Sequence, residues 1–131
     1  MFTDADADAD AGLWTSVINQ GRQQRQDHKM ELRTLANLAQ VLYADRGEAT
    51  RAIITWKQCL VLAGSGDQDK EMRRKVLNAI TIASMQRGRW DDARHFCEQH
   101  LSLATDQQNV LTLQHRAESI DHKAAAEPGN T

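Results

Sequence analysis

The chain has few of the residues that end helices or crosslink small folds. Its 131 residues include one proline, seven glycines and two cysteines, and aromatic residues make up 5%. So little proline and glycine favours a few long helices over many short strands and turns. The two cysteines lie 97 − 59 = 38 residues apart and have no framework spacing, which indicates a reduced, intracellular setting and a cytoplasmic location.

Strong net charge and long apolar runs are also missing. The formal net charge is −2, so there is no overall basic field to attract nucleic acid or an anionic membrane. No run of about 18 apolar residues occurs, so we expect no membrane span. The first ten residues, MFTDADADAD, lack the basic and apolar parts of a signal peptide. The length fits one domain.

Two stretches of the chain, residues 46–62 and 87–103, repeat the same pattern without a gap. Each opens with Arg-Gly, has alanine five residues after the glycine, and has a large or soft apolar residue four positions later. The offset is 93 − 52 = 41 residues, and self-similarity at such a period is typical of helical repeat arrays. The matched positions are Gly47 and Gly88, Ala52 and Ala93, and Trp56 and Cys97.

The apolar spacing predicts helical elements throughout residues 12–124. We expect repeat units over about 30–64 and 70–105, with capping helices over about 12–26 and 107–123. The acidic segment 1–11 and the tail 125–131 are predicted to be disordered. The first capping helix should end in the polar run 19–29. Its apolar stripe consists of Leu13, Trp14, Val17 and Ile18, and that of the last helix consists of Val110, Leu113, Ala117 and Ile120.

Several residues are predicted to fix the ends of these helices. Gly47 and Gly88 end the first helix of each pair, because glycine accepts a left-handed backbone. Asp67 or Asp69 is expected to cap the helix that follows the loop GSGDQD. The segment 105–108, TDQQ, fits a capping box for the last helix.

On these residues the chain resembles the tetratricopeptide repeat family, in which each unit is an antiparallel helix pair. The period of 41 residues is similar to the longer units of kinesin light chains and of GoLoco-containing spindle-orientation adaptors. Ala36 stands where the family usually has tryptophan. The resemblance covers about residues 30–104, and it implies an all-α, right-handed superhelix of two full repeats with flanking half-repeat helices. The positions that carry the family pattern are Ala39, Tyr43, Gly47, Ala52, Trp56 and Cys59 in the first unit, and Leu77, Ile80, Thr81, Ser84, Gly88, Trp90, Ala93, Cys97 and Leu101 in the second.

The resemblance also implies a binding groove, because in this family the first helix of each pair lines a concave face that holds a peptide. Asn37 and Asn78 occupy equivalent places, since 78 − 37 is again 41, and an amide offers both a donor and an acceptor to a peptide backbone. The alternative is that both asparagines simply face water. By helical spacing the groove residues are Thr34, Asn37, Val41, Ala44 and Asp45, followed by Lys75, Asn78, Ile82, Met85 and Gln86.

No motif for catalysis or phosphate binding is found, so we expect neither an enzyme nor a cofactor. His95, Cys97 and His100 are close in sequence, but Cys97 and His100 share the face that the repeat pattern buries. That face indicates packing rather than metal binding, and a zinc site needs four converging ligands. Lys70, Arg73, Arg74 and Lys75 form a basic cluster. Because acidic residues dilute this cluster and no aromatic residues interleave it, the sequence disfavours nucleic acid.

These features predict a non-catalytic protein–protein interaction module, an adaptor or scaffold that binds a peptide or helix of another protein. Two alternatives stay open: a permanent structural subunit of a larger assembly, and a nucleic-acid-associated helical repeat protein. Two clear units and two half-units are few for a solenoid, which usually needs about three units. We therefore also expect marginal stability alone, or self-association through an end helix.

Overall fold

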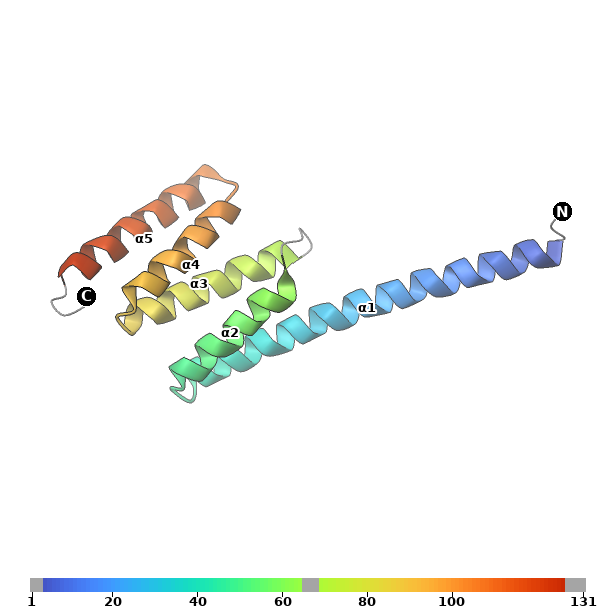
Figure 1. The fold of residues 1–131 in the computed structure, drawn as a ribbon, viewed down its shortest axis with the longest axis horizontal. Coiled ribbons are helices and arrows are strands. Elements are labelled where there is room, and N and C mark those ends of the chain that lie inside the picture. The colour runs from blue at the N-terminus through green and yellow to red at the C-terminus, as the bar shows by residue number, and fades with distance from the viewer. Residues whose placement is uncertain (1–3, 65–68, 127–131) are drawn as a thin grey trace.

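The part of the chain that the structure describes folds as a series of five helices (Figure 1). The computed structural model describes the backbone of residues 4–64 and 69–126, and the side chains of residues 12–64 and 69–126. No strand occurs within these ranges, and the predicted all-α class is confirmed. The helices are α1 (Asp4–Ala44), α2 (Ala49–Ala63), α3 (Lys70–Gln86), α4 (Trp90–Leu103) and α5 (Gln107–Ala126).

Helix α1 is continuous, which corrects the prediction of a separate capping helix over 12–26. The helix has 41 residues, a length of about 60 Å, and its N-terminal half projects from the body (Figure 1). The polar run 19–29 does not end it, because Gln, Arg and Lys propagate helices well and the run contains no proline. The single glycine of this run, Gly21, lowers the stability of the helix by only about 1 kcal/mol relative to alanine.

The prediction of disorder over residues 1–11 is also corrected, since α1 begins at Asp4. Alanine has the highest helix propensity, and carboxylates in the first turn favour the positive end of the helix dipole. Residues 1–3 lie outside the described part of the chain. In the tail, α5 extends to Ala126, and residues 127–131 are likewise outside it.

The predicted glycine turns join α1 to α2 and α3 to α4. Gly47 has φ +64° and Gly88 has φ +71°, a backbone region that side chains disfavour. At the end of α3, the Arg89 N–H donates to the Ser84 carbonyl at 2.9 Å, and the Gly88 N–H donates to the Met85 carbonyl at 3.1 Å. This is a Schellman motif, which satisfies carbonyls that the helix end would otherwise leave unpaired.

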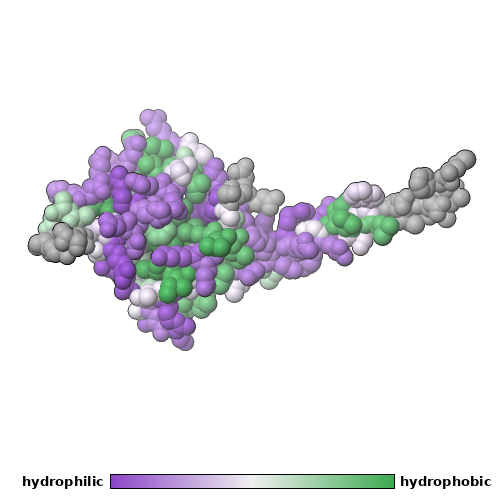
Figure 2. Space-filling view, in the orientation of Figure 1, coloured by the Kyte–Doolittle hydropathy of each residue, from purple (hydrophilic) through white to green (hydrophobic). Residues whose placement is uncertain are grey.

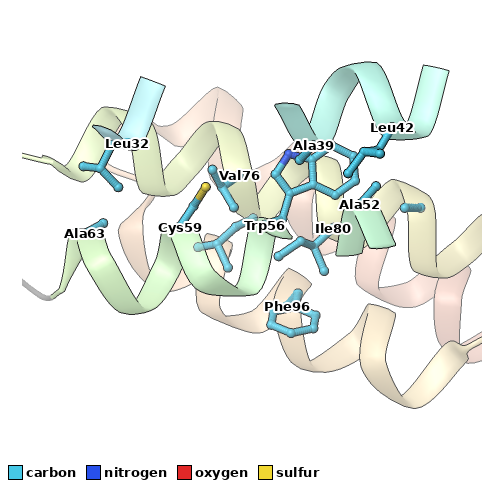
Figure 3. Packing of buried hydrophobic residues seen from close by; sticks show 12 residues of the cluster. Leu32, Ala39, Leu42, Ala52, Trp56, Cys59, Ala63, Val76, Ile80 and Phe96 are labelled. Carbon is cyan, nitrogen blue, oxygen red and sulfur yellow. The ribbon is translucent and has the colours of Figure 1, made fainter. Parts of the chain in front are cut away.

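Consecutive helices pack side by side, so that α1, α2, α3, α4 and α5 follow one another across the body (Figure 1). One cluster of buried residues lies among α1, α2 and α3 and includes Phe96 of α4 (Figure 3). Trp56 is at its centre with 3% of its surface exposed, and its ring lies 5.6 Å from that of Tyr43. A second cluster, around Trp90 and Ile120, joins α4 to α5.

Most of the positions that carry the repeat pattern are buried, whereas Leu101 is half-buried. Ala52 and Ala93 have no exposed surface, as the small residues of close helix crossings should. Tyr43 is half-buried against the first cluster. The other pattern positions that are buried are Ala39, Trp56, Cys59, Leu77, Ile80, Thr81, Ser84, Trp90 and Cys97.

Two predicted helix caps differ in the structure. Asp69 precedes α3, but its side chain makes no cap hydrogen bond; its carboxylate instead pairs with His28 Nε2 at 2.8 Å. Asp67 lies outside the described residues. At α5 the cap is Asp106, whose carboxylate accepts the Asn109 N–H at 2.8 Å, rather than the predicted capping box over 105–108.

Candidate binding surface

Helices α1, α3 and α5 share one spacing of buried and partly buried residues. In α3 and α5, buried residues recur with the same i, i+4, i+7 spacing, at an offset of 113 − 76 = 37 residues. In α1, Leu35, Ala39 and Leu42 have the same spacing, and Leu35 is partly buried while the other two are buried. Helix α5 therefore buries its residues with the same spacing as α3. The residues in the other two sets are Val76, Ile80 and Ala83 of α3, and Leu113, Ala117 and Ile120 of α5.

Polar contacts connect these helices directly, across the residues that separate them in sequence. His28 of α1 pairs with Asp69 at the start of α3, and Arg116 Nη1 of α5 donates to the Asn78 side-chain oxygen of α3 at 2.6 Å. Both contacts are partly buried, so they fix the spacing of neighbouring helices more firmly than surface ion pairs do.

A hollow of about 300 Å³ lies between α1 and α3, with Trp56 of α2 in its lining. Its polar side chains offer amide groups and positive charge, and no carboxylate is among its described lining residues. A smaller hollow of about 150 Å³ shares Arg33, Met72 and Lys75 with it and reaches toward Glu71. The lining of the larger one consists of Arg33, Ala36, Asn37 and Gln40 of α1, Trp56 of α2, and Met72, Lys75, Val76 and Ala79 of α3.

Of the predicted groove residues, only Asn37 and Lys75 line this hollow. Both are exposed, whereas Asn78 is half-buried and accepts the hydrogen bond from Arg116. The two equivalent asparagines thus have different surroundings. The rest of the predicted set divides into exposed residues, which are Thr34, Val41, Ala44, Asp45 and Gln86, and half-buried residues, which are Ile82 and Met85.

Sequence reasoning missed the other lining residues of the hollow, notably Arg33, Gln40 and Met72. One signal was present in the sequence. Ala36, where the tetratricopeptide repeat family usually has tryptophan, lies in the lining, and its small side chain leaves space beside Trp56. Arg33 lies three positions before Ala36 and Gln40 lies four positions after it, so all three residues share one face of α1.

The basic cluster at the start of α3 has a structural use. Arg73 Nη1 donates to the Gly64 carbonyl at 2.8 Å, just past the end of α2. Arg74 donates from Nε and Nη2 to the carbonyl of Leu103, the last residue of α4, at 3.1 and 2.7 Å. Cations at these carboxyl ends satisfy unpaired carbonyls and oppose the helix dipole. These contacts favour the structural interpretation of the cluster over nucleic-acid binding.

The histidine and cysteine side chains of α4 do not converge. The Cys97 thiol is buried and donates to the Leu113 carbonyl at 3.5 Å, while His95 is exposed and hydrogen-bonds Gln99. Burial, followed by the charges of Arg116 and Arg74, lowers the pKa of His100 below its ordinary value. Among the residues whose side chains the structure describes, no group of three His, Cys, Asp or Glu could hold a metal ion.

Burial also raises the pKa of both thiols, Cys59 and Cys97, above the ordinary value. Such a shift disfavours the thiolate, which is the reactive form. Both cysteines are therefore packing residues of the two clusters.

No protein-family model, no curated protein and no solved structure matches the chain. Within residues 4–64 and 69–126, no helix is both long and apolar enough to cross a membrane.

Proposed function

We propose that the chain is a non-catalytic protein–protein interaction module, a helical-repeat scaffold that binds an extended peptide of another protein in the hollow between α1 and α3. The observation that carries the proposal is the lining of this hollow. Asn37 and Gln40 offer donors and acceptors for a peptide backbone, the half-buried Met72 and Ala79 offer apolar contact, and no described lining residue is acidic.

The charge of the hollow indicates the kind of peptide. Arg33 and Lys75 are both exposed and approach it from opposite helices, so a carboxylate between them would meet two cations. A flexible peptide with one acidic side chain between apolar residues fits this arrangement. Arg74 is excluded from such a role because its donors are used on Leu103.

The proposal includes a right-handed superhelical arrangement of the pairs, in which α1, α3 and α5 share the binding face. Support comes from the equal spacing of their buried residues and from the contacts that link α1 to α3 and α3 to α5. In such an array a peptide runs across successive first helices. The module would then be a scaffold built from repeated antiparallel helix pairs.

The test begins with a displayed library of linear peptides selected against the wild-type chain. Binding of an enriched peptide is then measured by fluorescence anisotropy to wild type, Lys75→Glu and Asn37→Ala. We expect Lys75→Glu to weaken binding by about tenfold or more, equivalent to about 1.4 kcal/mol. Asn37→Ala should weaken binding less.

The matched control is Lys123→Glu, which makes the same charge change at an exposed position near the end of α5. Circular dichroism establishes that each variant keeps its helices. The proposal fails if selection enriches no peptide, or if Lys75→Glu and Lys123→Glu reduce binding equally.

A further inference from the structure

A basic cavity lies where the turn between α3 and α4 meets the first half of α2. Its volume is about 220 Å³, and it shares no lining residue with the hollow between α1 and α3. The lining mixes charged with apolar side chains, as the surface of the body does in Figure 2. The lining residues are Thr50, Ile53, Ile54 and Lys57 of α2, Arg87 and Arg89 of the turn, and Asp92 of α4.

The positive charges of this cavity have no ionic partner in the part of the chain that the structure describes. No carboxylate there forms an ion pair with Lys57, Arg87 or Arg89. Lys57 Nζ lies 5.8 Å from the centre of the Phe96 ring, a contact that leaves its charge in place. Asp92 is the one acidic residue of the described lining, so the three cations leave a net charge of +2. An anion that enters the cavity therefore meets positive charge that is not already neutralised.

The turn holds its two arginines in fixed places. Arg87 and Arg89 flank Gly88, and the Schellman hydrogen bonds of this turn fix the backbone of all three residues. Arg87 Nη1 donates to Thr50 Oγ1 at 2.5 Å, which connects the turn to α2. A guanidinium has five N–H donors, so this bond leaves four of them for a ligand.

The Thr50 hydroxyl adds a neutral donor to the cavity. The hydroxyls of Thr55, Thr81 and Thr112 each donate to the carbonyl four residues earlier in their own helix. Thr50 is the second residue of α2, so it has no helical carbonyl at that distance. Its oxygen accepts from Arg87, and its proton has no acceptor among the described groups. A ligand oxygen can take that proton.

We propose that this cavity binds a phosphate monoester, with the phosphate held by Arg87 and Arg89 and hydrogen-bonded by the Thr50 hydroxyl. A phosphate monoester carries a charge of about −1.5 to −2 at pH 7 and has three strong acceptor oxygens. Its charge matches the net charge of the lining, and its oxygens match the two arginines and the hydroxyl. A carboxylate has one charge and two oxygens, so it satisfies fewer of these groups.

The other lining residues restrict the ligand further. Asp92 opposes additional negative charge, so a single phosphate fits better than a polyphosphate. Ile53 and Ile54 give apolar contact to the group that carries the ester. Two sources supply such a group: a small phosphate ester, and a phosphorylated side chain of another protein. Both present the same phosphate to the cavity.

The first test is an NMR titration of the isotope-labelled full chain at constant ionic strength. Methyl phosphate represents the small ester, N-acetyl-phosphoserine amide represents the side chain, and acetate is the control anion. We expect saturable shifts of the amide signals of residues 50, 87 and 89 with both phosphates, and binding of acetate that is at least about tenfold weaker. Tighter binding of the phosphoserine probe would assign a phosphorylated side chain, and equal binding would assign a small ester.

The second test uses variants of exposed residues, so circular dichroism should show unchanged helices. Arg87→Gln and Arg89→Gln should each weaken binding of methyl phosphate by about tenfold. Thr50→Val keeps the shape of the side chain but removes the hydroxyl, and it should weaken binding about threefold. The matched control is Arg51→Gln, which removes the same charge beside Thr50 but outside the lining, where Arg51 pairs with Glu48 at 3.1 Å. This control should bind as wild type does.

Three results would overturn the proposal: no saturable shifts with either phosphate, acetate binding as tight as phosphate binding, or an equal loss of binding in Arg51→Gln and Arg87→Gln. The last result would indicate a diffuse basic surface in place of a site. Lys75→Glu changes the hollow between α1 and α3 and should leave phosphate binding unchanged. The phosphate site therefore stands or fails independently of the peptide binding proposed above.

Discussion

The close crossing at Ala93 gives the sharpest test of the packing. Ala93 has no exposed surface and belongs to the cluster that also contains Trp90, Cys97, Ala117 and Ile120. Ala93→Leu puts an isobutyl group where the neighbouring helices leave space for a methyl. Leucine is nearly as good a helix former as alanine, so propensity contributes little to the outcome.

Overpacking of this kind costs about 1–3 kcal/mol, a substantial part of the roughly 5–15 kcal/mol that stabilises a typical domain. If the helices around Ala93 could instead move apart freely, burial of the added apolar surface would raise the free energy of unfolding. The sign of the change in that free energy therefore decides between a close-packed site and one that opens. Ala52→Leu tests the equivalent position 41 residues earlier, which is also fully buried, and should cost a similar amount.

The assay is urea unfolding followed by circular dichroism, with the free energy of unfolding obtained by linear extrapolation. Repeating the unfolding at a second protein concentration reveals any contribution of self-association to apparent stability. Ala44→Leu, at the exposed last residue of α1, is the control and should change stability by less than about 0.5 kcal/mol. A helical, monomeric Ala93→Leu chain within that same limit would refute the close approach of α4 to its neighbours.

Two further predictions concern the polar groups around α4. Arg74→Met keeps the apolar stem but removes both donors to the Leu103 carbonyl, so it should lower the free energy of unfolding by about 1–2 kcal/mol. The control, Lys75→Met at the exposed neighbouring position, should leave the free energy of unfolding unchanged. Equal effects of the two variants in urea unfolding would contradict the capping role of Arg74. The lowered pKa of His100 means that, as pH falls through the ordinary value of 6.5, the unfolded chain takes up the proton first and stability is lost. Unfolding at pH 7.5 and 5.5 should show a smaller loss in His100→Gln than in wild type, and an identical loss would contradict this assignment.

The candidate site was only partly predictable from the sequence. Asn37 and Lys75 were placed on the binding face by helical spacing, and both line the hollow. The same spacing predicts Asn78 on that face, but Arg116 of α5 donates a hydrogen bond to its side chain. A repeat period cannot predict this contact, because the two residues are 38 apart in sequence. Arg33 and Met72 were missed because the hollow is defined by two helices together.

By itself, the sequence determined the features that depend on local conformation and on repetition. The helical class, the positive-φ turns at Gly47 and Gly88, and the burial of Ala52 and Ala93 follow from residue type and spacing alone. These features are local, since a glycine turn or an apolar stripe requires the same residues wherever the helix pair lies.

Only the tertiary structure decided which groups the polar side chains near the helix ends bind. Asp69 was predicted as a cap but pairs with His28, and Arg73 and Arg74 looked like a charged face but hold the carbonyl ends of α2 and α4. The break predicted before residue 30 is absent for a local reason, the helix propensity of the polar run, but only the folded structure shows that the apolar stripe of α1 is exposed. The contacts of Asp69, Arg73 and Arg74 depend on which groups the folded chain brings within hydrogen-bonding distance, and separation along the sequence does not specify that.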